Sequence, residues 1–405
     1  MGVFKHIPVD FISACLGIVF ILLDVGLDIW AAVSFYQEKA YWSLGVLLLL
    51  LIGSSVLVHV YSWLWYSYDG FERQTKVEKC LSLRALKILH VLQLGIYFRH
   101  AGVAEISLRR FSSTNQDHRD KALFTRNDLS ILRLIETFSE SAPQLVLMLA
   151  IILQRGELNP VTVGKTIGSA LAIAFRLTMH YRLERAILVN QQKQQITTSV
   201  IHFTCNLFLI SSRITALALF ASVLPCLIFI HFLCSWSVLF FIAWRSGTDF
   251  MDSPCGERLF QATVALICYF DWFNVGKQRP WLRRPLYHGC TLVDISLLCG
   301  LWYWKMSTEL PCFKIPLLYA VVTVVCVVGV YILGLLFKML HHKCSIQSLS
   351  TVELGGRTAD IKSNRVIAVS ADDPDSKLPE PPLSVEAKNV KSHKQSVSVI
   401  LTGVS

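Results

Sequence analysis

Long apolar stretches alternate with short polar connections over the first 340 residues of the chain. A bilayer core of about 30 Å needs about 20 helical residues to cross it, and eight stretches are long enough. They cover residues 9–36, 41–66, 127–154, 162–188, 198–223, 226–244, 286–304 and 315–340. The pattern predicts an all-α polytopic membrane protein with eight transmembrane helices.

Two weaker apolar stretches, 81–98 and 259–275, are interrupted by polar residues and flanked at both ends by Lys and Arg. Because basic flanks stay in the cytosol, each stretch is predicted to enter the membrane and return as a re-entrant half-helix. Eight spans then leave both termini in the cytosol and place 37–40, 155–161 and 305–314 on the opposite side. One half-helix in each half of the chain is typical of two pseudo-repeats, as in many transporters.

The composition agrees with a membrane protein. Hydrophobic residues make up 53% of the chain, charged residues only 16%, and the mean hydropathy is +0.50, which excludes an ordinary soluble domain. The formal net charge of +10 raises the question of nucleic acid. The basic residues, however, lie mostly in loops beside apolar stretches, which is the positive-inside pattern, so no nucleic acid partner is predicted.

The character of the chain changes at its C-terminal end. Residues 345–405 mix Ser, Asp, Lys, Pro and Val without helical or strand periodicity. Such composition predicts a disordered segment. We therefore divide the chain into a transmembrane domain, residues 1–340, and a cytosolic regulatory tail, residues 341–405.

Ionisable residues inside the apolar stretches are the strongest indication of function. Each costs about 2.5–3.5 kcal/mol at a helix centre on insertion scales. Seven lie inside the most apolar runs of the predicted spans: Asp24, Asp28, Glu136, Glu140, Arg176, Arg213 and Asp294. A membrane protein that keeps this many is expected to move something polar through the apolar layer.

The acids come in two pairs. Asp24 and Asp28 are four residues apart, as are Glu136 and Glu140, so each pair shares one helix face. One interpretation is structural, with the acids joining helices through Arg176 and Arg213. The other is a polar path, which the excess of acids over facing cations favours. Pro143 is expected to kink the helix that carries the Glu pair.

Enzyme chemistry finds no support in the sequence. Gly164-Lys165-Thr166 imitates the end of a phosphate-binding loop, but Asn159 replaces its first glycine. No HExxH, GxSxG or zinc-ligand spacing occurs. We predict no catalytic residues, no metal and no cofactor, and transport that needs no nucleotide hydrolysis.

Three segments carry a resemblance to a known family: LLDVGLDIWAAV (22–33), LRLIETFSESAPQLVLMLAIILQRGE (132–157) and GTDFMDSPCGERLFQATVALICYFDWFNV (247–275). The chain resembles the XK-related family of membrane proteins over residues 9–340, and in particular its apoptotic phospholipid scramblase branch. The resemblance implies eight spans with two half-helices in two repeats. It also implies ATP-independent exposure of phosphatidylserine at the plasma membrane.

The resemblance further implies a lipid-translocation path of charged residues. Carried onto this chain, its positions are Asp10, Asp24, Asp28, Glu136, Glu140, Arg213 and Asp294. One departure stands out, because the chain reads Thr178-Met179-His180 where related scramblases place an Asp in a middle span. The path is expected to be arranged differently at that level, with Arg176 nearby.

The tail contains a candidate control site. Asp372-Asp373-Pro374-Asp375-Ser376 fits the Asp-x-x-Asp pattern of an executioner caspase, with the small Ser376 after the cut. Proteolysis favours exposed, disordered segments. The resemblance implies activation by removal of the tail, here residues 376–405. It also implies a single-span immunoglobulin-type chaperone, basigin or neuroplastin-like, alongside phospholipids and the caspase as partners.

Two other function classes remain open at this point. One is a passive transporter or channel for small polar solutes that uses the same charges. The other is a membrane subunit without transport, in which the charges hold helices together. Charge-neutral substitutions at Asp28 and Glu140 separate them, because a structural role predicts misfolding and a path predicts normal expression without transport.

Overall fold

The computed structural model describes residues 24–68, 75–109, 116–156, 160–188, 196–248, 250, 251, 253–273, 280–308 and 318–340. All regular secondary structure in these residues is helical. An N-terminal helix is described from residue 24 to residue 37. It is followed by α2 (Tyr41–Tyr68), α3 (Lys76–Lys79), α4 (Leu83–Val91), α5 (Gly95–Arg109), α6 (Gln116–Glu136), the π-helix η2 (Thr137–Ser141), α7 (Ala142–Arg155), α8 (Pro160–Leu188), α9 (Ile196–Val223), α10 (Leu227–Ser246), α11 (Pro254–Phe270), α12 (Pro280–Thr308) and a last helix, Leu318–Leu340.

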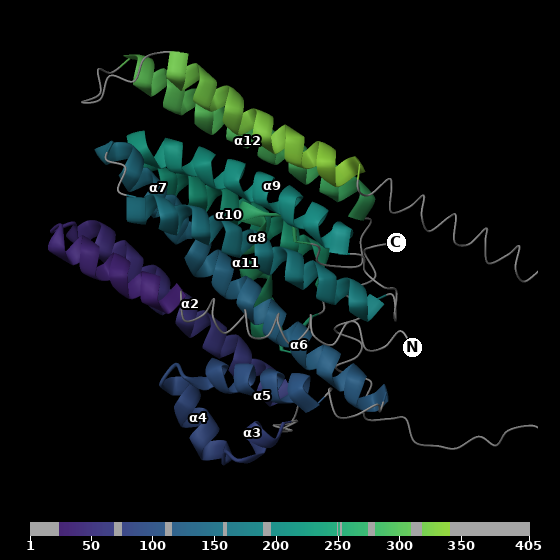
Figure 1. The fold of residues 1–405 in the computed structure, drawn as a ribbon. Helices are drawn as coiled ribbons and strands as arrows, with labels where there is room; N and C mark the ends of the chain where they lie inside the picture. The colour runs from purple at the N-terminus through teal and green to yellow at the C-terminus, as the bar shows by residue number, and fades with distance from the viewer. Residues whose placement is uncertain are drawn as a thin grey trace, which may run out of the picture.

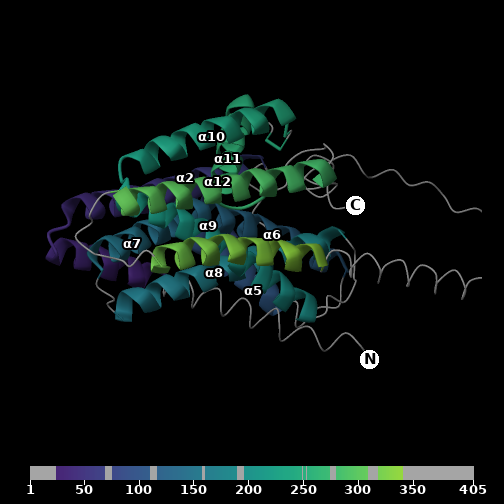
Figure 2. The same cartoon turned by 90° about the horizontal axis from the view of Figure 1, so that it is seen from above.

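The long helices lie side by side in one bundle (Figure 1). The short helices α3 and α4 form a smaller group with α5 against one end of α2. Seen from above, α10 runs along one edge of the bundle beside α11 (Figure 2). Helices are the expected elements here, because a chain in lipid must satisfy its backbone hydrogen bonds within each segment.

Five helices in the described part of the chain are long and apolar enough to cross a membrane: Tyr41–Tyr68, Thr125–Arg155, Thr197–Val223, Leu227–Ser246 and Leu318–Leu340. The helices α8 and α12, with 29 residues each, are also of spanning length but carry Lys165, Arg176 and Asp294 among their apolar residues. The protein is therefore an all-α polytopic membrane protein, as predicted. The count of eight spans and the pseudo-repeats stay predictions.

The bundle is centred on α9 and on the continuous run α6–η2–α7. Leu132, Phe138, Ile214 and Leu217 from these helices are at most 1% exposed. At the other extreme, no residue in the most apolar window of α10 is buried. Lipid tails are as apolar as these side chains, so an outer helix of a membrane bundle can leave them uncovered.

The first weak stretch forms a helical hairpin. Residues 83–91 and 95–109 make α4 and α5, joined by a turn in which Gln93 has a left-handed φ of 59°. Gly95 lets the two helices approach closely, because a Cβ there would lie 2.6 Å from ring atoms of His90. His90 in turn contacts Ser62 of α2 at 2.9 Å. The hairpin is thus fixed against α2. The second weak stretch corresponds to α11.

Candidate functional site: an acidic pocket in the bundle

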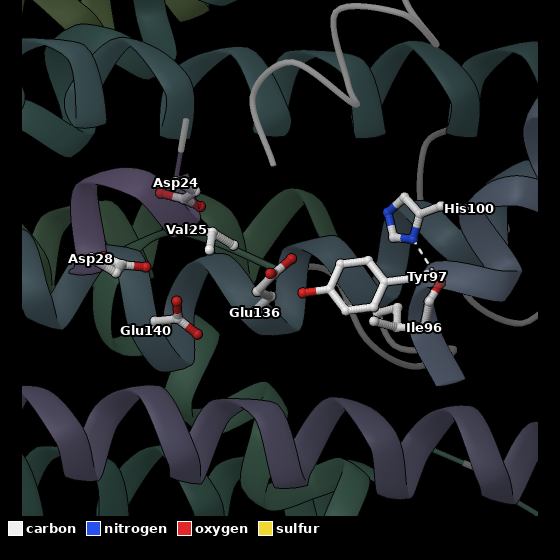
Figure 3. A pocket seen from close by; sticks show the side chains of 8 residues that line it. All are labelled: Asp24, Val25, Asp28, Ile96, Tyr97, His100, Glu136 and Glu140. Carbon is white, nitrogen blue, oxygen red and sulfur yellow. Dashed lines mark hydrogen bonds between the residues drawn. The ribbon is translucent and has the colours of Figure 1, made fainter. Parts of the chain in front are cut away.

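A pocket between three helical segments collects the four acids that the sequence singled out. Asp24 and Asp28 enter from the N-terminal helix, and Glu136 and Glu140 from α6 and η2. Val25 and three residues of α5, namely Ile96, Tyr97 and His100, complete the lining (Figure 3). The cavity volume is about 40 Å³, enough for about three waters. The predicted common face of each acid pair is confirmed.

Arg176 of α8 holds one of these acids from outside the pocket. Its guanidinium lies 2.7 Å from Asp24 Oδ2 and donates to Thr137 Oγ1 at 3.1 Å and to Ser141 Oγ at 3.4 Å. The two hydroxyls lie at the ends of the π-helix. Arg176 therefore joins the N-terminal helix to η2, as the structural interpretation of the charges predicts.

Asp28 is held by two other side chains. Gln144 of α7 donates to Asp28 Oδ1 at 2.7 Å, and Lys165 Nζ lies 3.8 Å from the same oxygen. Lys165 also donates to the Leu27 carbonyl at 2.8 Å. Asp28 is only 7% exposed, so these partners replace the water that its carboxylate loses. Sequence reasoning dismissed the Gly164-Lys165-Thr166 segment as a false phosphate loop and missed this role of Lys165.

Glu136 and Glu140 differ from the two Asp residues in their ion-pair partners. Glu136 and Glu140 form no ion pair with any residue in the described part of the chain. Figure 3 shows both carboxylates on the pocket side of the helix, Glu140 facing Asp28 and Glu136 facing the Tyr97 hydroxyl. The pocket therefore keeps two acids that no cation of the described residues contacts at ion-pair distance, although Arg133 and Arg176 act on them through space. A structural role alone does not require that.

Glu136 immediately precedes the π-helix η2 and Glu140 lies within it. The sequence did not predict this π-helix. Ser139 Oγ of η2 lies 2.7 Å from the Ile135 carbonyl and from Ser54 Oγ of α2, so its one hydrogen goes to the carbonyl and Ser54 donates to it. Thr137 donates to the Arg133 carbonyl at 2.7 Å. These bonds occupy backbone acceptors in the segment where the α-helical pattern is interrupted. Pro143 lies in the first turn of α7, immediately after η2. π-Helical turns are frequently found at functional sites.

A second charged cluster lies in the C-terminal half. Arg213 of α9 lies 2.5 Å from Asp294 Oδ2 of α12, and its Nε donates to the Tyr269 carbonyl at 3.2 Å. His231 of α10 bridges this pair, with Nε2 3.0 Å from Asp294 Oδ1 and Nδ1 3.0 Å from the Tyr269 hydroxyl. Two residues predicted for the path, Arg213 and Asp294, thus form one partly buried ion pair. The sequence did not indicate that His231 and Tyr269 belong to the same cluster.

Aromatic packing connects the two clusters. Phe138, which is 0% exposed and lies between the two Glu residues in sequence, stacks on Phe270 with ring centroids 5.9 Å apart. Phe270 packs edge-on against Tyr269 at 5.0 Å, and Tyr269 lies under the Arg213 guanidinium at 5.2 Å. The π-helix and the second cluster are therefore in continuous contact through the core.

The positions that depart from the family pattern are packed with neutral partners. His180 is buried, with Nδ1 3.0 Å from Ser130 Oγ and its ring stacked on Phe273. Thr178 accepts from Asn206 Nδ2 at 3.3 Å. No carboxylate replaces the expected Asp there. Asp10 and the tail residues Asp372, Asp375 and Ser376 lie outside the described residues.

The fold and the pocket define a polytopic all-α membrane protein that keeps both paired and unpaired acids inside its helix bundle. Comparison with known proteins agrees with this class. The sequence profile of the XK-related protein family matches residues 12–346. The chain therefore belongs to the XK-related family, which confirms the resemblance.

Three relatives illustrate the match. The chain is 37% identical to XK-related protein 8 of Tetraodon nigroviridis over 351 residues, which cover 85% of each chain. It is 37% identical to XK-related protein 8 of Gasterosteus aculeatus over 350 residues, 84% of each chain. With XK-related protein 8 of Pan troglodytes the identity is 36% over 337 residues, 82% of this chain and 83% of the relative.

Proposed function

We propose that this protein is a phospholipid scramblase that exposes phosphatidylserine at the cell surface during apoptosis. The observation that carries the proposal is the pair Glu136 and Glu140, two acids that line a pocket in a membrane bundle and form no ion pair among the described residues. Membership of the XK-related family supports it, as does the resemblance to the scramblase branch. The protein is not an enzyme in this proposal, because no bond of the lipid is made or broken.

The physical task fits such a pocket. A headgroup must cross about 30 Å of hydrocarbon while its acyl chains stay in lipid. Fixed charges along the bundle lower that barrier, since they replace part of the water that the headgroup loses. The path in this proposal runs past Asp10, Asp24, Asp28, Glu136 and Glu140, with Arg213 and Asp294 in the second half. The lipid moves down its own gradient without ATP.

Control is proposed to lie in the tail. A cavity of about 40 Å³ is too small for a whole phospholipid headgroup, so the path has to open before lipid moves. Cleavage by an executioner caspase after Asp375, within Asp372–Ser376, is the proposed trigger. Plasma membrane delivery by a basigin- or neuroplastin-like chaperone and cytosolic placement of both termini are further parts of the proposal.

The test measures annexin binding on cells that lack their own scramblases, after an apoptotic stimulus. Intact protein is expected to expose phosphatidylserine, and the Asp375→Ala and Glu140→Gln variants are expected not to. Glu38→Gln is the matched control, because Glu38 forms an exposed ion pair with Arg155, outside the pocket. Surface expression of every variant is measured in parallel.

Each outcome separates the alternatives. If both the intact protein and the Asp375→Ala variant expose phosphatidylserine, scramblase activity is supported but cleavage after Asp375 is not the trigger. Surface-expressed intact protein without exposure contradicts the proposal. Flux of small polar solutes in that case favours the passive transporter or channel.

A further inference from the structure

We propose that the surface of α3 and α4 binds anionic phospholipids of the membrane leaflet that it faces. The binding group consists of four exposed basic residues, Lys76, Lys79, Arg84 and Lys87. Both helices lie on the outside of the bundle, in contact with α5 (Figure 1). The inference goes beyond the proposed function, because this lipid is held at the surface by its phosphate and is not moved between leaflets.

The first argument is that these charges have no partner. None of the four basic side chains forms an ion pair with any residue that the structure describes. Lys76 and Lys79 are three residues apart in α3. Arg84 and Lys87 have the same spacing in α4, so the two members of each pair are neighbours on the helix surface. Neighbouring like charges repel each other, and a bound phosphate group removes that repulsion.

The acids of the same region are turned inward. Glu78 and Glu105 are the only acids of α3, α4 and α5. Glu78 is buried and accepts a hydrogen bond from the Tyr66 hydroxyl at 2.6 Å. Glu105 accepts from the Val77 backbone N–H at 3.0 Å. Since the one acid of α3 and α4 is buried, the exposed charge of these two helices is entirely positive.

The second argument is the apolar tip that follows the basic residues along α4. Ile88, Val91 and Leu92 are 58%, 75% and 60% exposed. At 1.5 Å per residue, Leu92 lies about 7–8 Å along the helix from Lys87. Amphipathic helices bury their apolar residues about 5–10 Å into the boundary between headgroups and acyl chains. A tip at that depth places Lys87 at the level of the phosphates.

The third argument is rigidity, because the hairpin that carries these residues is fixed to α2. Arg99 of α5 donates to Ser62 Oγ at 2.9 Å and to the Ser62 carbonyl at 3.1 Å. Its guanidinium also lies 4.0 Å from the centre of the Tyr66 ring. Arg99 is therefore a structural cation, in contrast to the four exposed ones. A rigid support lowers the entropic cost of binding a lipid.

These features together select the class of ligand. Clusters of four or more Lys and Arg beside a transmembrane helix attract anionic lipids, with a gain of about fivefold in affinity for each charge. Phosphatidylcholine carries no net negative charge, and a soluble phosphate has no apolar part to cover the tip. An anionic phospholipid meets both requirements.

The experiment measures the binding of short-chain lipids to the full-length protein in detergent, by microscale thermophoresis. The probes are the dioctanoyl forms of phosphatidylinositol bisphosphate, phosphatidylserine and phosphatidylcholine. Both anionic lipids are expected to bind the intact protein about tenfold or more tightly than phosphatidylcholine. Arg84→Gln/Lys87→Gln is expected to weaken binding of the anionic lipids by about tenfold or more and to leave that of phosphatidylcholine unchanged.

The matched control is Lys39→Gln/Arg155→Gln, which removes the same number of exposed positive charges near the Glu38–Arg155 ion pair. It is expected to bind all three lipids as the intact protein does. Size-exclusion profiles check that both variants are folded. An equal loss in the control overturns the inference, because attraction to the overall charge then explains binding.

Three further results overturn the inference. One is unchanged binding of the anionic lipids by Arg84→Gln/Lys87→Gln, and another is equal binding of all three lipids by the intact protein. The third is displacement of the lipid by inositol trisphosphate at equal concentration, which assigns the site to a soluble phosphate. The annexin assay tests the proposed function separately.

Discussion

At the residue scale, the acids of the pocket differ in what their charge does. Asp24 contacts Arg176 at 2.7 Å, so its neutralisation removes the one carboxylate at ion-pair distance from that guanidinium among the described residues. Glu140 interacts with Arg176 only through space and forms no ion pair in the described residues. The same chemical change is therefore expected to cost more stability at Asp24 than at Glu140.

The first prediction follows from this contrast. Asp24→Asn is expected to lower the free energy of unfolding by about 3–5 kcal/mol, the usual effect of breaking a buried pair. Glu140→Gln is expected to be at least as stable as the intact protein and inactive in lipid movement. Thermal unfolding in detergent measures the first quantity and the annexin assay the second. A strongly destabilised Glu140→Gln variant would support the purely structural interpretation.

A second prediction concerns Arg176, whose guanidinium contacts Asp24, Thr137 and Ser141. Arg176→Gln is expected to destabilise the protein by several kcal/mol. The double variant Asp24→Asn/Arg176→Gln is expected to recover part of that loss, since neither charge is then left alone. The control Arg155→Gln breaks an exposed pair with Glu38 and should change stability by about 1 kcal/mol or less. Additive losses in the double variant would contradict the pairing.

At the element scale, the π-helix sets the register between α6 and α7. One residue turns an α-helix by about 100°, so removing the extra residue rotates α7 relative to α6. Deletion of Ser139 is expected to take Gln144 away from Asp28 and to abolish folding or activity. Ser139→Ala keeps the register and loses the contacts of the hydroxyl with Ser54, Ile135 and the Glu136 carbonyl.

The two variants are compared by thermal unfolding and by lipid movement. Ser139→Ala should cost about 1–3 kcal/mol of stability, the penalty for unsatisfied hydrogen-bonding groups. An active, stable deletion variant would show that the π-helical register is not needed.

The α4–α5 hairpin gives a prediction at the same scale. Gly95→Ala places a Cβ 2.6 Å from the His90 ring, so α5 has to move away from α4. Since α5 also carries Tyr97 and His100 into the acidic pocket, both stability and lipid movement are expected to fall. Measuring the two in the single variant and in His90→Ala/Gly95→Ala checks the cause, because the smaller side chain makes room. No recovery in the double variant would point to another cause.

At the scale of the whole molecule, loops at the ends of the bundle can be used to test the predicted membrane topology. The segments 37–40 and 155–161 are predicted to lie on the outer side. Glu38 and Arg155 form an ion pair, so these two connections meet at one end of the bundle. In a chain with Cys226 and Cys312 replaced by Ser, Glu38→Cys and Arg155→Cys are therefore expected to react equally with an impermeant maleimide applied to intact cells. The native Cys80 is the internal control on the cytosolic side of the predicted topology. Labelling of only one introduced cysteine would contradict the predicted topology.

The sequence by itself determined the helices, the membrane class and the common face of each acid pair. These properties are local: hydropathy over about 20 residues decides insertion, and i, i+4 spacing decides the face. The segments around 22–33, 132–157 and 247–275 were also sufficient for the family. The weak stretches were found as helices for the same local reason.

Only the tertiary structure decided which charges meet. Arg176 and Asp24 are 152 residues apart, Lys165 and the Leu27 carbonyl 138, and Arg213 and Asp294 81. Helix packing, which depends on side chains from many segments at once, sets such pairings. The π-helix likewise depends on Ser54 and Arg176 from other helices. Glu136 and Glu140 form no ion pair among the described residues, because Arg176 and Lys165 contact Asp24 and Asp28 instead, a fact that no local pattern contains.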